Sequence, residues 1–126
     1  MAKNCLCIFI VLLVAGCANK KETVKISYFE NGEIKSISRH KNGNLDGQCV
    51  WLYPNGNVEQ IVPFVNGVAS GRAIYFYESG ALKSTRQWHA GKLNGLVTDY
   101  ANDTIGKVNT VVLFENGVIK DLRRNN

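Results

Sequence analysis

The sequence contains few of the side chains from which catalytic and metal centres are built. It has two histidines in 126 residues, His40 and His89, and neither has cysteines or clustered acidic residues at the spacing that a metal site requires. The acidic residues are scattered, and the sequence has no glycine-rich phosphate loop and no nucleophile elbow. We therefore expect no enzyme activity, no metal site and no cofactor.

The sequence also has no long hydrophobic run. Its longest apolar segment, from Cys5 to Ala15, has eleven residues, whereas a helix needs roughly 20 to cross a bilayer. Lys3 precedes this segment, and a polar stretch at 19–22 follows almost at once. A transmembrane helix and a buried core helix are the alternatives, but the segment is short, N-terminal and not amphipathic. These features favour a secretory signal peptide.

The end of this segment, Leu13 to Cys17, resembles the lipobox of bacterial lipoproteins, in which an aliphatic residue and two small residues precede a cysteine. It departs at Val14, where leucine is commoner. The resemblance implies that the Cys17 thiol takes a diacylglyceryl group and that lipoprotein signal peptidase cuts between Gly16 and Cys17. The new amino terminus is often acylated as well, with a chain such as palmitate. We thus expect a signal peptide at 1–16 and a lipidated tether at 17–24.

The expected location is the cell envelope. Lipoproteins of bacteria with two membranes tend to stay in the inner membrane when aspartate follows the lipidated cysteine. Ala18 occupies that position here. In such a host the sequence therefore favours the outer membrane, on its periplasmic or surface face.

Cysteine becomes scarce once this processing is considered. Of the four cysteines, Cys5 and Cys7 leave with the signal peptide and Cys17 is capped by lipid, so only Cys49 remains free. We expect no intrachain disulfide, and packing and hydrogen bonds must stabilise the mature chain. Loss of Lys3 lowers the formal net charge from +5 to +4.

The most prominent feature that is present is a 24-residue repeat. The motif at 28–32 recurs at 52–56 and at 76–80. Three glycine series keep this period: Gly32, Gly56 and Gly80; Gly43, Gly67 and Gly91; and Gly47, Gly71 and Gly95. In a fourth copy, Gly106 lies 26 residues after Gly80, so its first turn holds two extra residues, and Asp121 stands where a third glycine is expected.

The glycines predict turns between strands. Asn31-Gly32 and Asn55-Gly56, and more weakly Ser79-Gly80, are typical of two-residue type I′ hairpin turns, which need positive φ at both residues. The segments from Gly43 to Gly47 and its equivalents are predicted to be longer turns that join one hairpin to the next.

The segments between the turns have the composition of strands. Side chains at equivalent positions are predicted to form ladders on the sheet. The columns are Ile34, Val58, Leu82 and Val108; Trp51 and Tyr75; Phe29, Tyr53 and Tyr77; and His40, Phe64, Trp88 and Phe114. Cys49 is expected to be a small apolar sheet residue. Pro63 cannot donate a ladder hydrogen bond and predicts a bulge or an outward-facing amide position.

The pattern Tyr-x-x-x-Gly-x-hydrophobic-Lys at 28–35 and its equivalent at 76–83, with the closing glycine pairs at 42–47 and 90–95, resembles the variant MORN repeat. The resemblance departs at Glu59, where lysine is expected, and in the stretched fourth copy. It implies an all-β fold, an elongated antiparallel meander of about four β-hairpin repeats in a single twisted sheet. We expect the sheet over 25–122 and a polar tail at 123–126.

The resemblance indicates function poorly, so three hypotheses stay open. The first is a membrane-anchored, non-enzymatic scaffold that binds a protein partner, with aromatic anchors at Trp51, Tyr53, Tyr75, Tyr77 and Trp88. The alternative role of these aromatic residues is to pack the sheet against itself. The second hypothesis, implied by the resemblance alone, is an immunity or antitoxin-like protein that neutralises a toxic partner. The third is contact with anionic lipid through Lys35, Arg39, Lys83 and Arg86. Export argues against a nucleic-acid partner, and open sheet edges make self-association plausible.

Overall fold

A computed structural model describes residues 9–10, 21–103 and 105–125 of the chain. The strands in these ranges are β1 (Phe9–Ile10), β2 (Glu22–Tyr28), β3 (Ile34–Lys41), β4 (Asn44–Leu45), β5 (Gly47–Leu52), β6 (Val58–Val65), β7 (Val68–Ala69), β8 (Gly71–Phe76), β9 (Leu82–His89), β10 (Lys92–Tyr100), β11 (Val108–Glu115) and β12 (Val118–Arg124). The described residues contain no helix.

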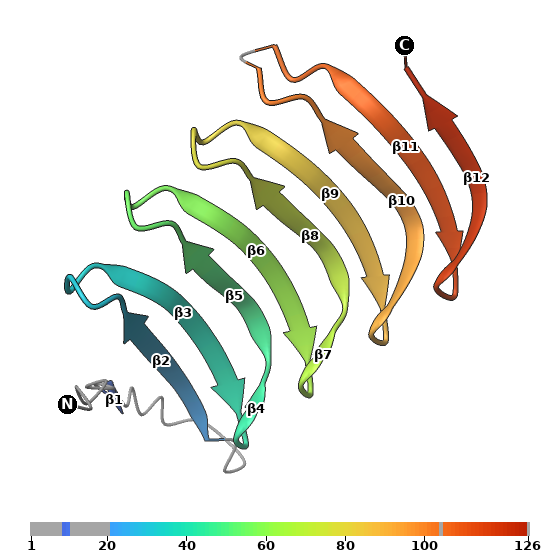
Figure 1. Ribbon diagram of the computed structural model, residues 1–126. Helices are drawn as coiled ribbons and strands as arrows, with labels where there is room; N and C mark the ends of the chain where they lie inside the picture. The colour runs from blue at the N-terminus through green and yellow to red at the C-terminus, as the bar shows by residue number, and fades with distance from the viewer. Residues whose placement is uncertain (1–8, 11–20, 104, 126) are drawn as a thin grey trace.

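The strands form one antiparallel sheet in which almost every strand lies beside the next one in the chain. The order is β1-β2-β3-β5-β6-β8-β9-β10-β11-β12, with β4 paired to β3 and β7 paired to β6. Figure 1 shows the hairpins succeeding one another along one direction, from β2 near the N-terminal end to β12 at the other. The predicted all-β antiparallel meander is confirmed.

The first turn of each repeat is the one at Asn31-Gly32 and its equivalents. The type I′ geometry predicted for these first turns is wrong. Gly32 has φ +88°, but Asn31 is not among the residues of positive φ. The Gly32 amide donates to the Phe29 carbonyl at 3.0 Å, and the Phe29 amide donates to the Glu33 carbonyl at 2.8 Å. The Asn31 side chain instead accepts a hydrogen bond from the Glu33 amide at 3.0 Å. Asparagine is used here as a side-chain acceptor within a longer turn, and Asn55-Gly56 repeats the arrangement.

The two-residue turns with positive φ at both residues occur at the second glycine series, where longer turns were predicted. Asn42-Gly43 has φ values of +51° and +85°, and Lys41 pairs directly with Asn44 across it. The same geometry is present at Asn66-Gly67, Ala90-Gly91 and Asn116-Gly117. These values match the type I′ turn of tight hairpins. An Asn-Gly pair alone therefore does not distinguish the two turn types in this chain.

The third glycine series lies in strand bulges. The Ser70 amide donates a hydrogen bond to the Pro63 carbonyl at 3.0 Å. On one side of this point Phe64 of β6 pairs with β7, and on the other side Ile61 of β6 pairs with β8. Of the two alternatives predicted at Pro63, the structure has a bulge, whose extra residues lie opposite Pro63 on the paired chain segment, and the equivalent bulge opposite Arg39 forms without a proline. Gly71 has φ +113°, and a Cβ there would lie 3.0 Å from the Pro63 Cγ. The bulge needs glycine for both reasons.

Alternation along the paired strands gives the sheet two faces, which we name by their side chains. The aromatic face carries a register row across the sheet: Ser27, Ser36, Trp51, Gln60, Tyr75, Ser84, Asp99, Thr110 and Arg124. The isoleucine face carries the adjacent row: Ile26, Ile37, Val50, Ile61, Ile74, Thr85, Thr98 and Val111.

The few fully buried side chains lie mainly at the centre of the aromatic face. Cys49 and Ala73 are 0% exposed and Ser84 is 1% exposed. They are small, so the larger neighbours on the same face close over them. Each strand contacts mainly the strands that lie beside it in the sheet. Within the described residues, no second layer of helices or strands covers either face of the sheet. The prediction that Cys49 is a small apolar sheet residue is confirmed.

Replacement of Gly71 by alanine is expected to destabilise the protein more than the same change at Gly56. Gly56 also has positive φ, at +87°, but a Cβ there would meet nothing within 4 Å. We expect a loss of about 1 kcal/mol for Gly56→Ala from backbone strain, and at least about 2 kcal/mol for Gly71→Ala, where contact with Pro63 adds to the strain. Urea unfolding of both variants measures the difference, and equal losses would contradict this account of the bulge.

Candidate interaction surfaces

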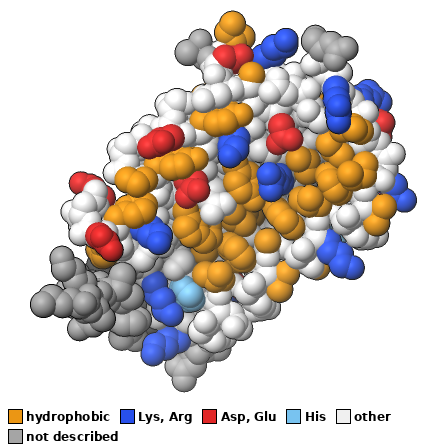
Figure 2. All heavy atoms as spheres, in the orientation of Figure 1, with side chains coloured by type: hydrophobic (Ala, Val, Ile, Leu, Met, Phe, Trp, Pro, Cys, Tyr) orange, Lys and Arg blue, Asp and Glu red, His pale blue; other side chains and the backbone are white. Residues whose placement is uncertain are grey.

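The aromatic face brings together three of the five aromatic residues predicted to form an interaction surface. Trp51 and Tyr75 lie on either side of Gln60 in the register row. Trp88 lies in a second row at the other end of the strands, and all three side chains are half-buried. Figure 2 shows one broad face of the molecule, on which hydrophobic side chains form a nearly continuous band across the strands, broken by a few charged groups.

The second row of the aromatic face is the predicted column of bulky residues. It consists of His40, Phe64, Trp88 and Phe114, which pair across the tight turns with Leu45, Ala69, Leu93 and Ile119. The Trp51 and Phe64 rings are 6.4 Å apart between centroids and inclined at 57°, within the range of favourable aromatic pairs. The two rows thus approach each other at Trp51 and Phe64.

Tyr53 and Tyr77 have a different role from the other three aromatic residues. The Tyr53 hydroxyl donates to the Phe76 carbonyl at 2.9 Å, and the Tyr77 hydroxyl donates to the Tyr100 carbonyl at 2.9 Å. Each therefore links one hairpin to the next near the first turns. Burial, together with the nearby carboxylates of Glu59 and Glu78, raises the pKa of Tyr53 and favours the protonated donor.

Strand β9 carries three of the four buried polar atoms of the aromatic face that lack hydrogen-bond partners among the described residues, and the fourth is His40 Nδ1 on β3. Ser84, Arg86 and Trp88 are successive residues on this face, and the Ser84 Oγ, Arg86 Nε and Trp88 Nε1 are buried without a hydrogen-bond partner among the described residues. The Arg86 guanidinium lies 4.6 Å from the centroid of the Tyr75 ring, a cation–π distance. The aromatic face is therefore amphipathic at β9 rather than purely apolar.

The four cations considered for lipid contact do not form one patch. Lys35 lies over the Phe29 ring at 5.8 Å and Lys83 over the Tyr77 ring at 5.6 Å, both near the first turns. Arg39 pairs with Val24 on the isoleucine face, whereas Arg86 is on the aromatic face. A flat membrane surface could therefore not contact all four cations at once, because Arg39 and Arg86 lie on opposite faces of the sheet.

The histidines do not form a metal centre in the described part of the chain. His40 lies on the aromatic face with its Nε2 3.0 Å from the Ser38 Oγ, and His89 pairs with Lys92 at a tight turn. Residues 9–10, 21–103 and 105–125 contain no group of three or more side chains that could hold a metal ion.

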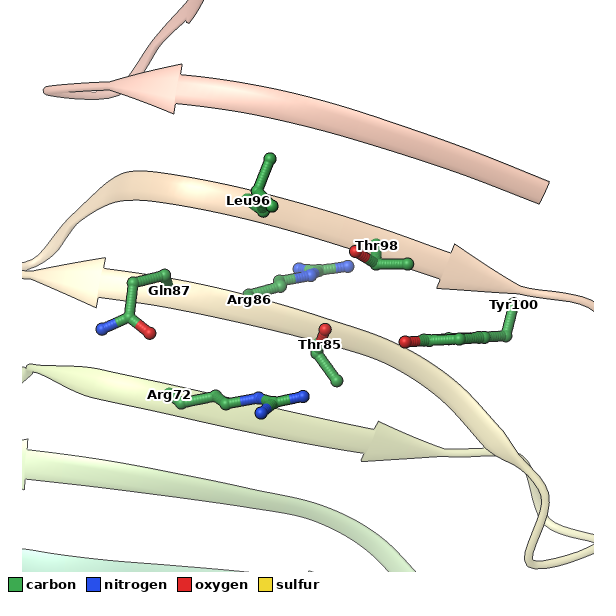
Figure 3. Close-up of a pocket in the computed structure, with 7 residues that line it drawn as sticks. All are labelled: Arg72, Thr85, Arg86, Gln87, Leu96, Thr98 and Tyr100. Carbon is green, nitrogen blue, oxygen red and sulfur yellow. The ribbon is translucent and has the colours of Figure 1, made fainter. Parts of the chain in front are cut away.

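A shallow hollow of about 360 Å³ lies on the isoleucine face over β8, β9 and β10. Figure 3 shows the residues that border it: Arg72, Thr85, Arg86, Gln87, Leu96, Thr98 and Tyr100. The sequence reasoning did not identify this hollow. Its signal was present, because threonine replaces isoleucine or valine at Thr85 and Thr98 in an otherwise aliphatic ladder.

The predicted lipid attachment at Cys17 and cleavage after Gly16 lie outside the described residues. The predicted signal peptide overlaps them only at β1, whose Phe9 and Ile10 pair with Lys25 and Val24 of β2. Among the described residues, no helix is long and apolar enough to cross a membrane.

The sequence matches the MORN repeat variant family twice, at residues 21–42 and 45–66. No curated protein matches it significantly. The first match covers β2 and β3, and the second covers β5 and β6, so each corresponds to one hairpin of the sheet. The same hairpin geometry continues in β8–β9 and β10–β11. The chain therefore contains two variant MORN repeats, which form the first half of a regular antiparallel sheet.

Proposed function

We propose that this protein is a non-enzymatic, membrane-anchored interaction module that presents its aromatic face to a protein partner. The observation that carries the proposal is the uncovered aromatic face, on which Trp51, Tyr75 and Trp88 are half-buried and no other element of the described chain packs. Tryptophan, tyrosine and arginine are the residues most often found as anchors of binding energy at protein interfaces. The variant MORN repeats are consistent with such a module.

The composition of this face favours a protein over a membrane surface as its partner. Gln60, Ser84 and Asp99 lie in the same register row as Trp51 and Tyr75. Protein interfaces combine an aromatic centre with hydrogen-bonding groups. A carboxylate such as that of Asp99 would be repelled by anionic headgroups. In the proposal, lipid on Cys17 supplies the membrane attachment and the sheet supplies recognition.

A photo-crosslinking probe tests this proposal. A benzophenone amino acid at Tyr75 is expected to give a discrete protein adduct in native membranes, whereas the probe at Ile74 is not. Tyr75 and Ile74 are neighbours on β8 that face opposite sides of the sheet. Loss of two interface anchors in a Trp51→Ala, Trp88→Ala variant should lower the adduct yield at least about tenfold.

Circular dichroism of the double variant controls for loss of the fold. Absence of any adduct from Tyr75, or equal adducts from both positions, would reject the aromatic face as the binding surface. An unchanged yield in a folded double variant would reject Trp51 and Trp88 as its anchors.

A further inference from the structure

The hollow on the isoleucine face occurs where the repeat changes its chemistry. Ile26, Ile37, Val50, Ile61 and Ile74 are paired in turn across the first part of the ladder. Thr85 and Thr98 continue the row and pair with each other. Threonine has a hydroxyl where the aliphatic residues have a methyl or ethyl group. The change therefore places two hydrogen-bonding groups in an apolar row.

The groups around the two threonines are mostly hydrogen-bond donors. Arg72 pairs with Gln87, one position along the same strands, and Figure 3 shows the Arg72 guanidinium extending along β8 toward Thr85. The hydroxyl end of Tyr100 points back toward Thr85 from the other side. Arg72 makes no ion pair with any described residue, and no acidic side chain borders the hollow.

An apolar wall accompanies these donors. Leu96 is 56% exposed although β10 is paired on both sides, and it borders the hollow beside Thr98. A ligand with a short aliphatic stem and an anionic, oxygen-rich end matches both parts of the site. A planar carboxylate accepts two parallel hydrogen bonds from a guanidinium, and threonine or tyrosine hydroxyls can donate to its remaining lone pairs.

We infer that this hollow is a second binding site, which takes a glutamate side chain of an acidic peptide segment. Arg72 binds the carboxylate, the hydroxyls of Thr98 and Tyr100 donate further hydrogen bonds, and Leu96 contacts the methylene groups of the stem. The site lies on the face opposite Trp51, Tyr75 and Trp88, and it does not depend on the proposed role of those residues. The positive formal net charge of the chain, +5, favours the approach of an acidic segment.

Binding of fluorescein-labelled hexaglutamate to the full chain, followed by fluorescence anisotropy at low ionic strength, tests the inference, with hexaglutamine as the control peptide. We expect hexaglutamate alone to bind. Arg72→Gln should weaken binding about tenfold or more, because it removes a charge-assisted contact. Lys92→Gln removes an equal charge from an exposed residue of β10 that does not border the hollow, and it should change binding less than about twofold.

Thr98→Val tests the site without changing charge or volume appreciably. It should weaken binding about threefold to tenfold, the effect of one neutral hydrogen bond, while the fold is retained. Equal effects of Arg72→Gln and Lys92→Gln would show attraction by net charge alone and overturn the inference. Absence of hexaglutamate binding would also overturn it, as would Arg72-dependent binding to phosphatidylserine vesicles without binding to the peptide. The Tyr75 crosslink should be unaffected by Arg72→Gln, so the two surfaces can fail separately.

Discussion

Replacement of Cys17 by serine is expected to abolish lipidation, so that the protein carries no acyl chain and is not cut before residue 17. The lipobox-like sequence at 13–17 predicts a thioether-linked diacylglyceryl group on this residue. Burial of acyl chains contributes about 0.8 kcal/mol per methylene group, so two or three chains make attachment effectively permanent. A serine hydroxyl does not replace the thiol in the lipid transfer. The intact mass of protein from the native host measures the effect.

The matched control is Cys7→Ser, which changes a cysteine of the apolar segment and leaves Cys17 in place. It should yield residues 17–126 with two or three acyl chains, as for the wild-type protein. An unmodified wild-type mass that includes Met1 or Ala2 would contradict both lipidation and cleavage. If cleavage occurs as proposed, Phe9 and Ile10 are removed and the outer edge of β2 loses the strand that pairs with it.

Replacement of Cys49 by aspartate is expected to leave the protein largely unfolded. Cys49 is 0% exposed at the centre of the aromatic face, and its register partner is Val62. A carboxylate there would lose its hydration, and the Val62 side chain opposite offers it no hydrogen-bond donor. The effective penalty for burying such a charge is several kcal/mol, a large part of the 5–15 kcal/mol that stabilises a typical domain.

Gln48→Asp provides the control, because Gln48 is the preceding residue of β5 and is exposed on the opposite face. Both changes place aspartate in the same strand, so its low strand propensity, worth about 1 kcal/mol, affects both variants. Urea unfolding monitored by tryptophan fluorescence should show a stable Gln48→Asp protein and little or no folded Cys49→Asp protein. Similar stabilities would mean that position 49 is hydrated in solution.

The period of the glycines allowed the fold to be predicted, because each glycine column marks a change of strand direction or a bulge. It did not specify which turn each column makes. Asn31-Gly32 and Asn42-Gly43 have the same two residues but different geometries, since the asparagine at 31 is held by its side-chain hydrogen bond to Glu33. The difference in turn geometry depends on how the flanking strands pair, and an Asn-Gly pair does not by itself specify that pairing.

The candidate surfaces were predicted in part. The repeat columns placed Trp51, Tyr75 and Trp88 on the sheet as candidate anchors, but they did not separate these from Tyr53 and Tyr77, whose hydroxyls bond to backbone carbonyls 23 residues away. The hollow beside Arg72 was missed because it arises from three strands together. Its threonines break a row that becomes visible only when the register across β8, β9 and β10 is known.

The succession of hairpins along one direction also determines how the sheet responds to force. Interstrand hydrogen bonds run across the strands, and thus nearly parallel to a line from β2 to β12 (Figure 1). A pull applied between Glu22 and Arg124 would load the strand pairs in the manner of a zipper, with the outermost pair opening before the next. Shear along the strands would instead load many hydrogen bonds of a pair at once. The sheet is therefore mechanically weakest along its row of hairpins, and tension along this direction would lengthen the chain strand by strand.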